Sequence, residues 1–232
     1  MMIFRGLQKT TLVDYPGKVA CTLFVDKCNF RCPFCQNSVL VFEKETNVIT
    51  EQEVLAFLEK RKKVLQGVCI TGGEPTLHTE LKEFLPKVKA LGYKIKIDTN
   101  GSMPNFIREL IDAKLVDYVA MDVKAPLEKY DIAAGVNVNK QAIKESIALL
   151  LKGRIDYEFR STIVPTIIEL EDMHKIGELI KGAKAYYLQQ FVNDVPLLNP
   201  EFEKIAPYPH KTLQAMAEIM KKYVKKVGIR GV

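Results

Sequence analysis

The chain has 232 residues, of which 47% are hydrophobic and 27% charged, and its formal net charge is +6. A chain of this length can bury one large core, and no apolar run approaches the ~20 residues that a membrane helix needs. The first residues lack the basic-then-apolar order of a secretory signal, so we expect a single cytoplasmic domain without a membrane partner. The lysines are spaced as on solvated helix faces and have no aromatic residues between them, which disfavours nucleic acid as a partner.

Six strand-like apolar runs alternate with segments of helical periodicity. Strands are expected at residues 19–25, 68–71, 93–98, 118–123, 157–164 and 185–191. The helix after the first strand starts with a capping box formed by Thr50 and Glu53. This alternation implies right-handed crossovers and a parallel sheet, and six units fall short of the eight in a closed barrel of ~250 residues. The sequence therefore predicts an open partial (β/α)6 TIM-like barrel with parallel strands.

Four segments make up this single predicted domain. An N-terminal segment, 1–18, precedes a barrel core over 19–192. The stretch 193–209 has four prolines and no clear periodicity, which indicates an ordered loop over the barrel mouth or a mobile flap. An apolar stripe then predicts a C-terminal helix over 210–232. His210, at its start, is interpreted as a solvated histidine.

Three cysteines follow the first predicted strand with the spacing C-x3-C-x2-C: Cys28, Cys32 and Cys35. A fourth ligand would close a zinc site or complete an iron–sulfur cluster, but Cys21 and Cys69 lie inside apolar runs and are interpreted as small core residues. A cubane cluster held by three cysteines leaves one iron open for chemistry. The alternatives are a zinc knot, or two buried thiols with a third unrelated one.

Polar residues stand at the carboxyl ends of the predicted strands, where the reacting groups of a parallel barrel lie. Each one alone has an ordinary explanation, such as a tight turn, a helix N-cap or a surface ion pair. Together they would converge on one mouth. The set comprises Gly72, Gly73 and Glu74 after the second strand, Asp98 and Thr99 at the third, Asp122 and Lys124 at the fourth, Arg160 in the fifth, and Gln189 with Gln190 in the sixth.

The cysteine spacing, with Phe34 directly before the last cysteine, resembles that of the radical S-adenosylmethionine enzymes. The nearer resemblance is to the activating enzymes of anaerobic ribonucleotide reductase and pyruvate formate-lyase. It is carried by residues 6–10 and 14–17, by the cysteine loop with Gln36-Asn37, and by residues 72–75. These matches are dense in the first third of the chain and thin beyond it. Gln36 departs from the family pattern, which often has histidine there.

This resemblance implies a 4Fe–4S cluster on the three cysteines, at which S-adenosylmethionine is reductively cleaved to methionine and a 5′-deoxyadenosyl radical. By similarity, Asp122 contacts the ribose of S-adenosylmethionine and Lys124 contacts its carboxylate. Asp98 and Thr99 lie near its amino group or a bound monovalent cation, and Arg160 is a further candidate contact. The backbone of Gly72 and Gly73 lies against the methionyl part of the cofactor. Glu74 or a strand-edge carbonyl accepts a hydrogen bond from its ammonium, and Phe34 belongs to the cofactor site.

The activating enzymes abstract hydrogen from a glycine of a large glycyl-radical enzyme and take electrons from a donor such as flavodoxin or ferredoxin. The resemblance therefore implies both kinds of partner, and a barrel open at one side would admit a partner loop. The anaerobic ribonucleoside-triphosphate reductase is the expected protein substrate. Two alternatives remain open: a radical S-adenosylmethionine enzyme that modifies a small molecule or nucleotide, and a non-enzymatic iron–sulfur or zinc protein.

Overall fold

The structure is a computed structural model that describes residues 1–43 and 47–231. Its contacts group these residues into two compact units. The first consists of Met1–Asn29, Val39–Thr99 and Asn105–Val119. The second consists of Phe30–Ser38, Asn100–Pro104 and the chain from Ala120 onward. No helix among the described residues is long and apolar enough to span a bilayer.

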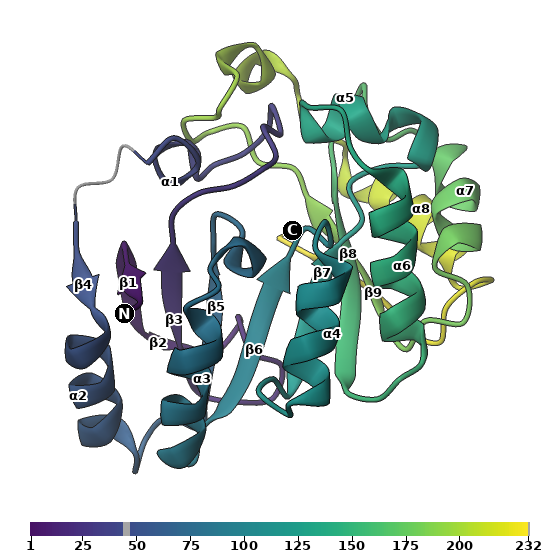
Figure 1. The fold of residues 1–232 in the computed structure, drawn as a ribbon. Coiled ribbons are helices and arrows are strands. Elements are labelled where there is room, and N and C mark those ends of the chain that lie inside the picture. Colours follow the sequence, from purple (N-terminus) through teal and green to yellow (C-terminus); the bar gives the residue numbers. More distant parts are fainter. Residues whose placement is uncertain (44–46, 232) are drawn as a thin grey trace. The chain divides into compact units, whose positions relative to one another are not determined.

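The first unit is built on parallel strands that are joined by helices (Figure 1). Its strand order is β2-β3-β5-β6, in which β3, β5 and β6 are parallel and β2 is antiparallel to β3. A separate antiparallel pair joins β1 to β4. The strands are β1 (Ile3–Phe4), β2 (Gly6–Thr11), β3 (Ala20–Val25), β4 (Ile49–Thr50), β5 (Gly67–Gly72) and β6 (Lys94–Thr99). The helices are α1 (Ser38–Val41, at the boundary of the units), α2 (Glu51–Arg61), η1 (Pro75–Leu77), α3 (Leu81–Ala90) and α4 (Pro104–Asp112).

Side-chain alternation gives the sheet of the first unit two different faces. Apolar residues such as Leu23, Ile70 and Ile97 are fully buried on one face, and Figure 1 shows α2, α3 and α4 on one side of β3, β5 and β6. The other face carries polar residues, because successive side chains of a strand point to opposite sides. Thr22, Cys69 and Lys96 are partners in register on that face.

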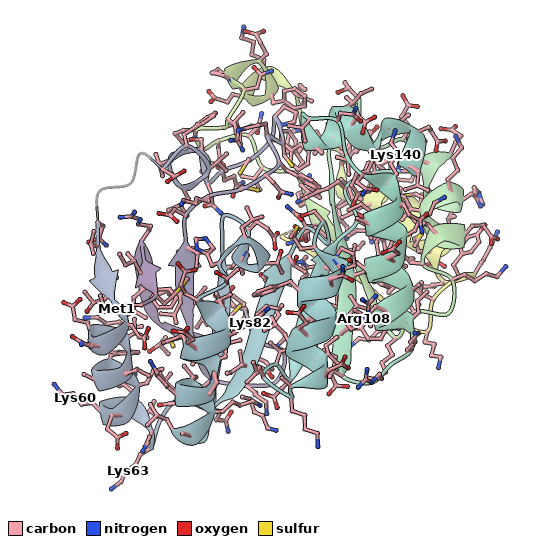
Figure 2. All side chains as sticks on the ribbon, viewed as in Figure 1. Met1, Lys60, Lys63, Lys82, Arg108 and Lys140 are labelled. Carbon is pink, nitrogen blue, oxygen red and sulfur yellow. The ribbon has the colours of Figure 1, made fainter. Side chains whose placement is uncertain are left out.

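The predicted capping box is present at the start of α2. The Thr50 hydroxyl accepts from the Glu53 amide at 3.2 Å, and the Glu53 carboxylate accepts from the Thr50 amide at 2.7 Å. Lys60 near the end of this helix and Lys63 just beyond it are exposed, and Figure 2 shows both extending away from the ribbon. These lysines therefore form the solvated face that their spacing predicts.

The second unit continues the alternation of strands and helices with the order β7-β8-β9-β10, and β8, β9 and β10 are parallel. Its strands are β7 (Tyr118–Asp122, which starts at the boundary of the units), β8 (Asp156–Ile163), β9 (Tyr186–Gln190) and β10 (Val227–Arg230). Its helices are η2 (Leu127–Lys129), α5 (Tyr130–Ala134), α6 (Lys140–Leu151), α7 (Asp172–Leu179), η3 (Pro200–Lys204) and α8 (His210–Met220). The predicted parallel α/β architecture is confirmed.

The C-terminal helix predicted over 210–232 is wrong in its extent, because α8 ends at Met220 and Val227–Arg230 forms strand β10 beside β9. The apolar stripe misled the prediction because Val224 is buried although it lies past the helix. The chain turns there by giving backbone groups to the sheet, with the Tyr186 amide donating to the Lys226 carbonyl at 2.9 Å. The stretch 193–209 contains the short helix η3 within otherwise irregular chain.

Candidate active site

The cysteine loop leaves β3 and crosses the boundary of the units, so that Cys28 belongs to the first unit and Cys32 and Cys35 to the second. None of the three cysteines forms a disulfide; Cys32 is buried and the other two are half-buried. The Cys35 amide donates to the Cys32 carbonyl at 3.0 Å, which places these two cysteines on one tight turn. Phe34, between them, is buried, whereas Gln36 is exposed.

Two segments of the second unit hold this turn in place. On one side, the amides of Leu198 and Asn199 donate to the carbonyls of Cys35 and Pro33, both at 2.9 Å. On the other side, the Arg31 amide donates to the Ala134 carbonyl at 2.7 Å. Gly135 makes this approach possible, since a Cβ there would lie 2.1 Å from the Arg31 carbonyl oxygen. Backbone hydrogen bonds therefore fix the conformation of this loop.

A charged cluster lies after β7 and on β8 in the same unit. The Asp122 carboxylate accepts from Lys124 at 2.8 Å and from Arg160 Nε at 2.9 Å. Burial would raise the pKa of Asp122, but the two cations outweigh burial and hold that pKa well below its usual range. Burial acts against the charged form of Lys124 as well, and Asp122 and Cys32 raise its pKa above the ordinary lysine value. The cluster therefore keeps its charges and carries one net positive charge.

This positive charge also acts on the thiols of the loop. Burial raises the pKa of Cys35 above the ordinary thiol value, and a backbone hydrogen bond from Asn37 and the Lys124 charge offset only part of that rise. The Lys124 charge acts toward the thiolate, the form that ligates a metal, at both Cys32 and Cys35. At Cys35, burial outweighs it.

In the first unit, Glu74 points into the protein. Its carboxylate is 1% exposed, and one oxygen, Oε1, accepts from the Thr76 amide at 3.1 Å, the Thr76 hydroxyl at 2.5 Å and the Thr99 hydroxyl at 2.7 Å. Glu74 therefore joins the loop after β5 to the end of β6. Thr99, predicted as a cofactor contact, is buried as the partner of this carboxylate.

The glycines after β5 have a packing role in the structure. A Cβ on Gly73 would lie 2.0 Å from the Lys27 carbonyl oxygen and 2.5 Å from that of Asp26. The Glu74 amide donates to the Lys27 carbonyl at 2.6 Å. The absence of a side chain at Gly73 therefore allows this turn to pack directly against the chain that leads into Cys28.

Asp98 is paired with Lys96, a residue that the sequence reading missed. Lys96 is 1% exposed, forms an ion pair with Asp98 and lies 3.7 Å from the Cys69 sulfur. A signal for it was available, since Lys96 and Asp98 alternate with Ile95 and Ile97 and must share a face of β6. The buried pair between Glu158 on β8 and Arg230 on β10 was also missed, because Arg230 fell within the expected helix.

Each unit thus brings together its own part of the predicted site. The second unit collects Asp122, Lys124 and Arg160 around one carboxylate, with Cys32 and Cys35 near Lys124. The first unit collects Glu74 and Thr99, and it binds Asp98 to Lys96 instead of leaving it unpaired. Gln190, at the end of β9, donates its amide to backbone carbonyls and has a structural role.

Comparison with known proteins identifies the family. The family model for the radical SAM superfamily matches residues 22–182. A Methanocaldococcus jannaschii protein that carries the name of a glycyl-radical enzyme activating enzyme is 32% identical over 98% of this chain and 95% of its own length. A 7-carboxy-7-deazaguanine synthase of Koribacter versatilis is 31% identical over 68% of this chain and 66% of its own.

The fold agrees with this result. The crystal structure of QueE from Escherichia coli superimposes with a TM-score of 0.59 over 99% of this chain and 94% of that one, at 15% identity. The prediction of a parallel-strand α/β fold of the partial barrel kind is therefore confirmed. The chain belongs to the radical SAM superfamily, and it is an enzyme of that class.

Proposed function

We propose that this radical SAM enzyme activates a separate, larger glycyl-radical enzyme by abstracting a hydrogen atom from one of its glycines, with anaerobic ribonucleoside-triphosphate reductase as the protein substrate. The observation that carries the proposal is the extent of the likeness to the M. jannaschii protein, which spans 98% of this chain and 95% of its relative. That span includes the residues that resemble the activating enzymes: 6–10, 14–17, the cysteine loop with Gln36-Asn37, and 72–75.

The superfamily's cofactors are a 4Fe–4S cluster and S-adenosylmethionine, and the residues present fit them. Three cysteines outside any disulfide lie on one loop, and the Lys124 charge lies close enough to two of them to act on their thiols. No group of three His, Cys, Asp or Glu side chains among the described residues is gathered around a single point. A cubane does not require such a group, because each thiolate serves a different iron. When bound, the two cofactors supply a 5′-deoxyadenosyl radical.

The charged cluster of the second unit is the proposed binding site for the carboxylate and ribose of S-adenosylmethionine. Lys124 would pair with the carboxylate, because the cluster has one more cation than anions. Asp122, held ionised by Lys124 and Arg160, would accept from the ribose hydroxyls. Arg160 fixes the orientation of Asp122 through the bond from its Nε and contributes the remaining charge.

The first unit carries the residues that the resemblance assigns to the cofactor's amino group, and their contacts distinguish their roles. Glu74 is engaged with Thr76 and Thr99, so we assign it a positioning role and leave the cofactor ammonium to a backbone carbonyl at the edge of β5. The Lys96 charge already compensates Asp98, which leaves less reason for a monovalent cation there than the resemblance implied. Asp98 would then accept from the ammonium or orient its approach.

The test is electron paramagnetic resonance of the candidate reductase. The reconstituted protein with S-adenosylmethionine and an electron donor such as flavodoxin or ferredoxin should generate a glycine-centred doublet on the reductase. Omitting this protein should remove the signal, and so should Cys32→Ala in this protein. Deoxyadenosine formation without a radical on the reductase would contradict the proposal.

A second candidate is the modification of a small heterocycle, which the likeness to 7-carboxy-7-deazaguanine synthase suggests. That likeness covers 68% of this chain and 66% of the synthase. An assay for 7-carboxy-7-deazaguanine as a product would separate the two functions. Formation of that product, with no glycyl radical on the reductase, would favour the synthase-like activity.

A further inference from the structure

Three polar side chains form a row across the second unit's sheet. Thr162 on β8, Gln189 on β9 and Arg230 on β10 are partners in the parallel register. Thr162 follows Arg160 by two residues and therefore lies on the same face of β8. At about 3.3 Å per residue, it stands about 7 Å farther toward the carboxyl end of the strand than Arg160. The row thus borders the charged cluster on the side where the strands end.

Thr162 and Gln189 differ from their charged neighbours in having no hydrogen-bond partner for their side chains among the described residues. Arg160 is bound to Asp122. Arg230 is bound at both terminal nitrogens to Glu158, at 2.6 and 2.9 Å. Both Thr162 and Gln189 are half-buried on this face. A hydroxyl and an amide are therefore left to bind something that is not charged.

We infer that Thr162 and Gln189 bind the main chain of the protein segment that carries the reacting glycine, an inference that rests on the proposed function. A glutamine amide donates and accepts at once, which matches the C=O and N–H of a peptide group. The threonine hydroxyl beside it can bind the next peptide group of an extended segment. Because the contacts are to the backbone, they suit a glycine, which offers no side chain to hold.

The aromatic residue of this face supports a peptide over a planar heterocycle. Tyr187 lies in register between Arg160 and Gly228, and the Arg230 guanidinium stacks on its ring at 3.6 Å. A base or pterin would use such a ring as a stacking platform. In this protein the Arg230 guanidinium already covers the Tyr187 ring, and its ion pair with Glu158 holds it there. What remains accessible on the face is hydrogen-bonding capacity without a free charge.

The experiment compares Gln189→Ala and Thr162→Val with the wild-type enzyme and with Gln214→Ala, a matched change at an exposed glutamine of α8. The readouts are iron content, S-adenosylmethionine affinity, deoxyadenosine formed without a protein substrate, and glycyl-radical formation on the purified reductase. A synthetic peptide that copies the sequence around the reductase's radical glycine serves as the second probe.

We expect both variants to keep iron content, cofactor affinity and the uncoupled reaction, because neither residue belongs to the charged cluster. Each should raise the KM for the reductase and weaken peptide binding about tenfold, the loss expected for one hydrogen bond made by a group that is then left unpaired. Gln214→Ala should match the wild type. Thr162→Ser should recover most of the binding, because it restores the hydroxyl.

Two results would overturn the inference alone: radical yields and peptide affinities equal to the wild type in both variants, or an equal loss of S-adenosylmethionine affinity, which would place the row in the cofactor site. Failure of the wild-type enzyme to form any glycyl radical would instead refute the proposed function, and this inference with it. The wild-type control therefore separates the two failures.

Discussion

The hydrogen bond between Glu74 and Thr99 predicts a measurable coupling between the loop after β5 and the end of β6. The Thr99 hydroxyl donates to Glu74 Oε1 at 2.7 Å, and both side chains are almost fully buried, so solvent weakens the bond little. A hydrogen bond to a charged group contributes about 1.5–3 kcal/mol. Thr99→Val should therefore lower the free energy of unfolding by about 2 kcal/mol. For a chain of this length, that loss lowers Tm by about 4–8 °C.

A double-mutant cycle isolates this bond. Glu74→Gln keeps an acceptor oxygen but removes the charge, so the cycle with Thr99→Val should give a coupling energy of about 1–1.5 kcal/mol. The assay is anaerobic urea unfolding of the cluster-free protein, with Thr79→Val, at an exposed threonine, as a control that should change stability by less than about 0.5 kcal/mol.

Two outcomes would refute a stabilising bond between Glu74 and Thr99. Single effects that add within about 0.3 kcal/mol would show that Glu74 and Thr99 do not act on each other. Unchanged stability in Glu74→Gln, together with loss of S-adenosylmethionine binding, would make Glu74 a direct cofactor contact instead of a residue that positions the loop.

Three further predictions concern the second unit and the thiols. Lys124→Ala should weaken S-adenosylmethionine binding without loss of iron, as measured by equilibrium binding and iron analysis; unchanged affinity would remove Lys124 from the site. Cys28→Ala should abolish the cluster, of which the wild type should hold about four irons and four sulfides, whereas Cys21→Ala should keep it; stoichiometric zinc without visible absorbance would contradict this. In the folded, cluster-free protein at pH 8, iodoacetamide should label the half-buried Cys28 and spare Cys21, because Cys21 is fully buried and burial raises its pKa to about 12; rapid labelling of Cys21 would show that this part of the core opens.

Much of the fold could be predicted from local patterns. Six strands (β3, β5, β6, β7, β8 and β9) and the helix that Thr50 caps follow from apolar runs, alternation and capping, each of which acts over a few residues. Strands β1, β2 and β4 were not expected. The end of α8 could not be predicted in this way. Val224 is buried by tertiary packing, and it therefore continues the apolar stripe beyond the last residue of the helix. Strand β10 has four residues and gains its stability from pairing with β9, which no local pattern reveals.

The candidate site likewise has features that the sequence predicts and features that it does not. Residues at strand ends could be predicted as a group, since a parallel sheet brings those ends together. Their partners could not, because Glu74 and Asp98 have similar strand-end positions but one binds two threonines and the other a buried lysine. Gly73 was expected to admit a ligand, and the structure shows that it admits the chain before Cys28.

Hydrogen transfer from a labelled glycine would identify the atom that the enzyme abstracts. The candidate reductase would be prepared with glycine deuterated at Cα and incubated with this enzyme, reductant and unlabelled S-adenosylmethionine, and the mass of the 5′-deoxyadenosine would be measured by mass spectrometry. Deoxyadenosine should gain one deuterium in step with the appearance of the glycyl radical. Unlabelled deoxyadenosine, formed while the reductase carries no radical, would refute glycine as the hydrogen donor.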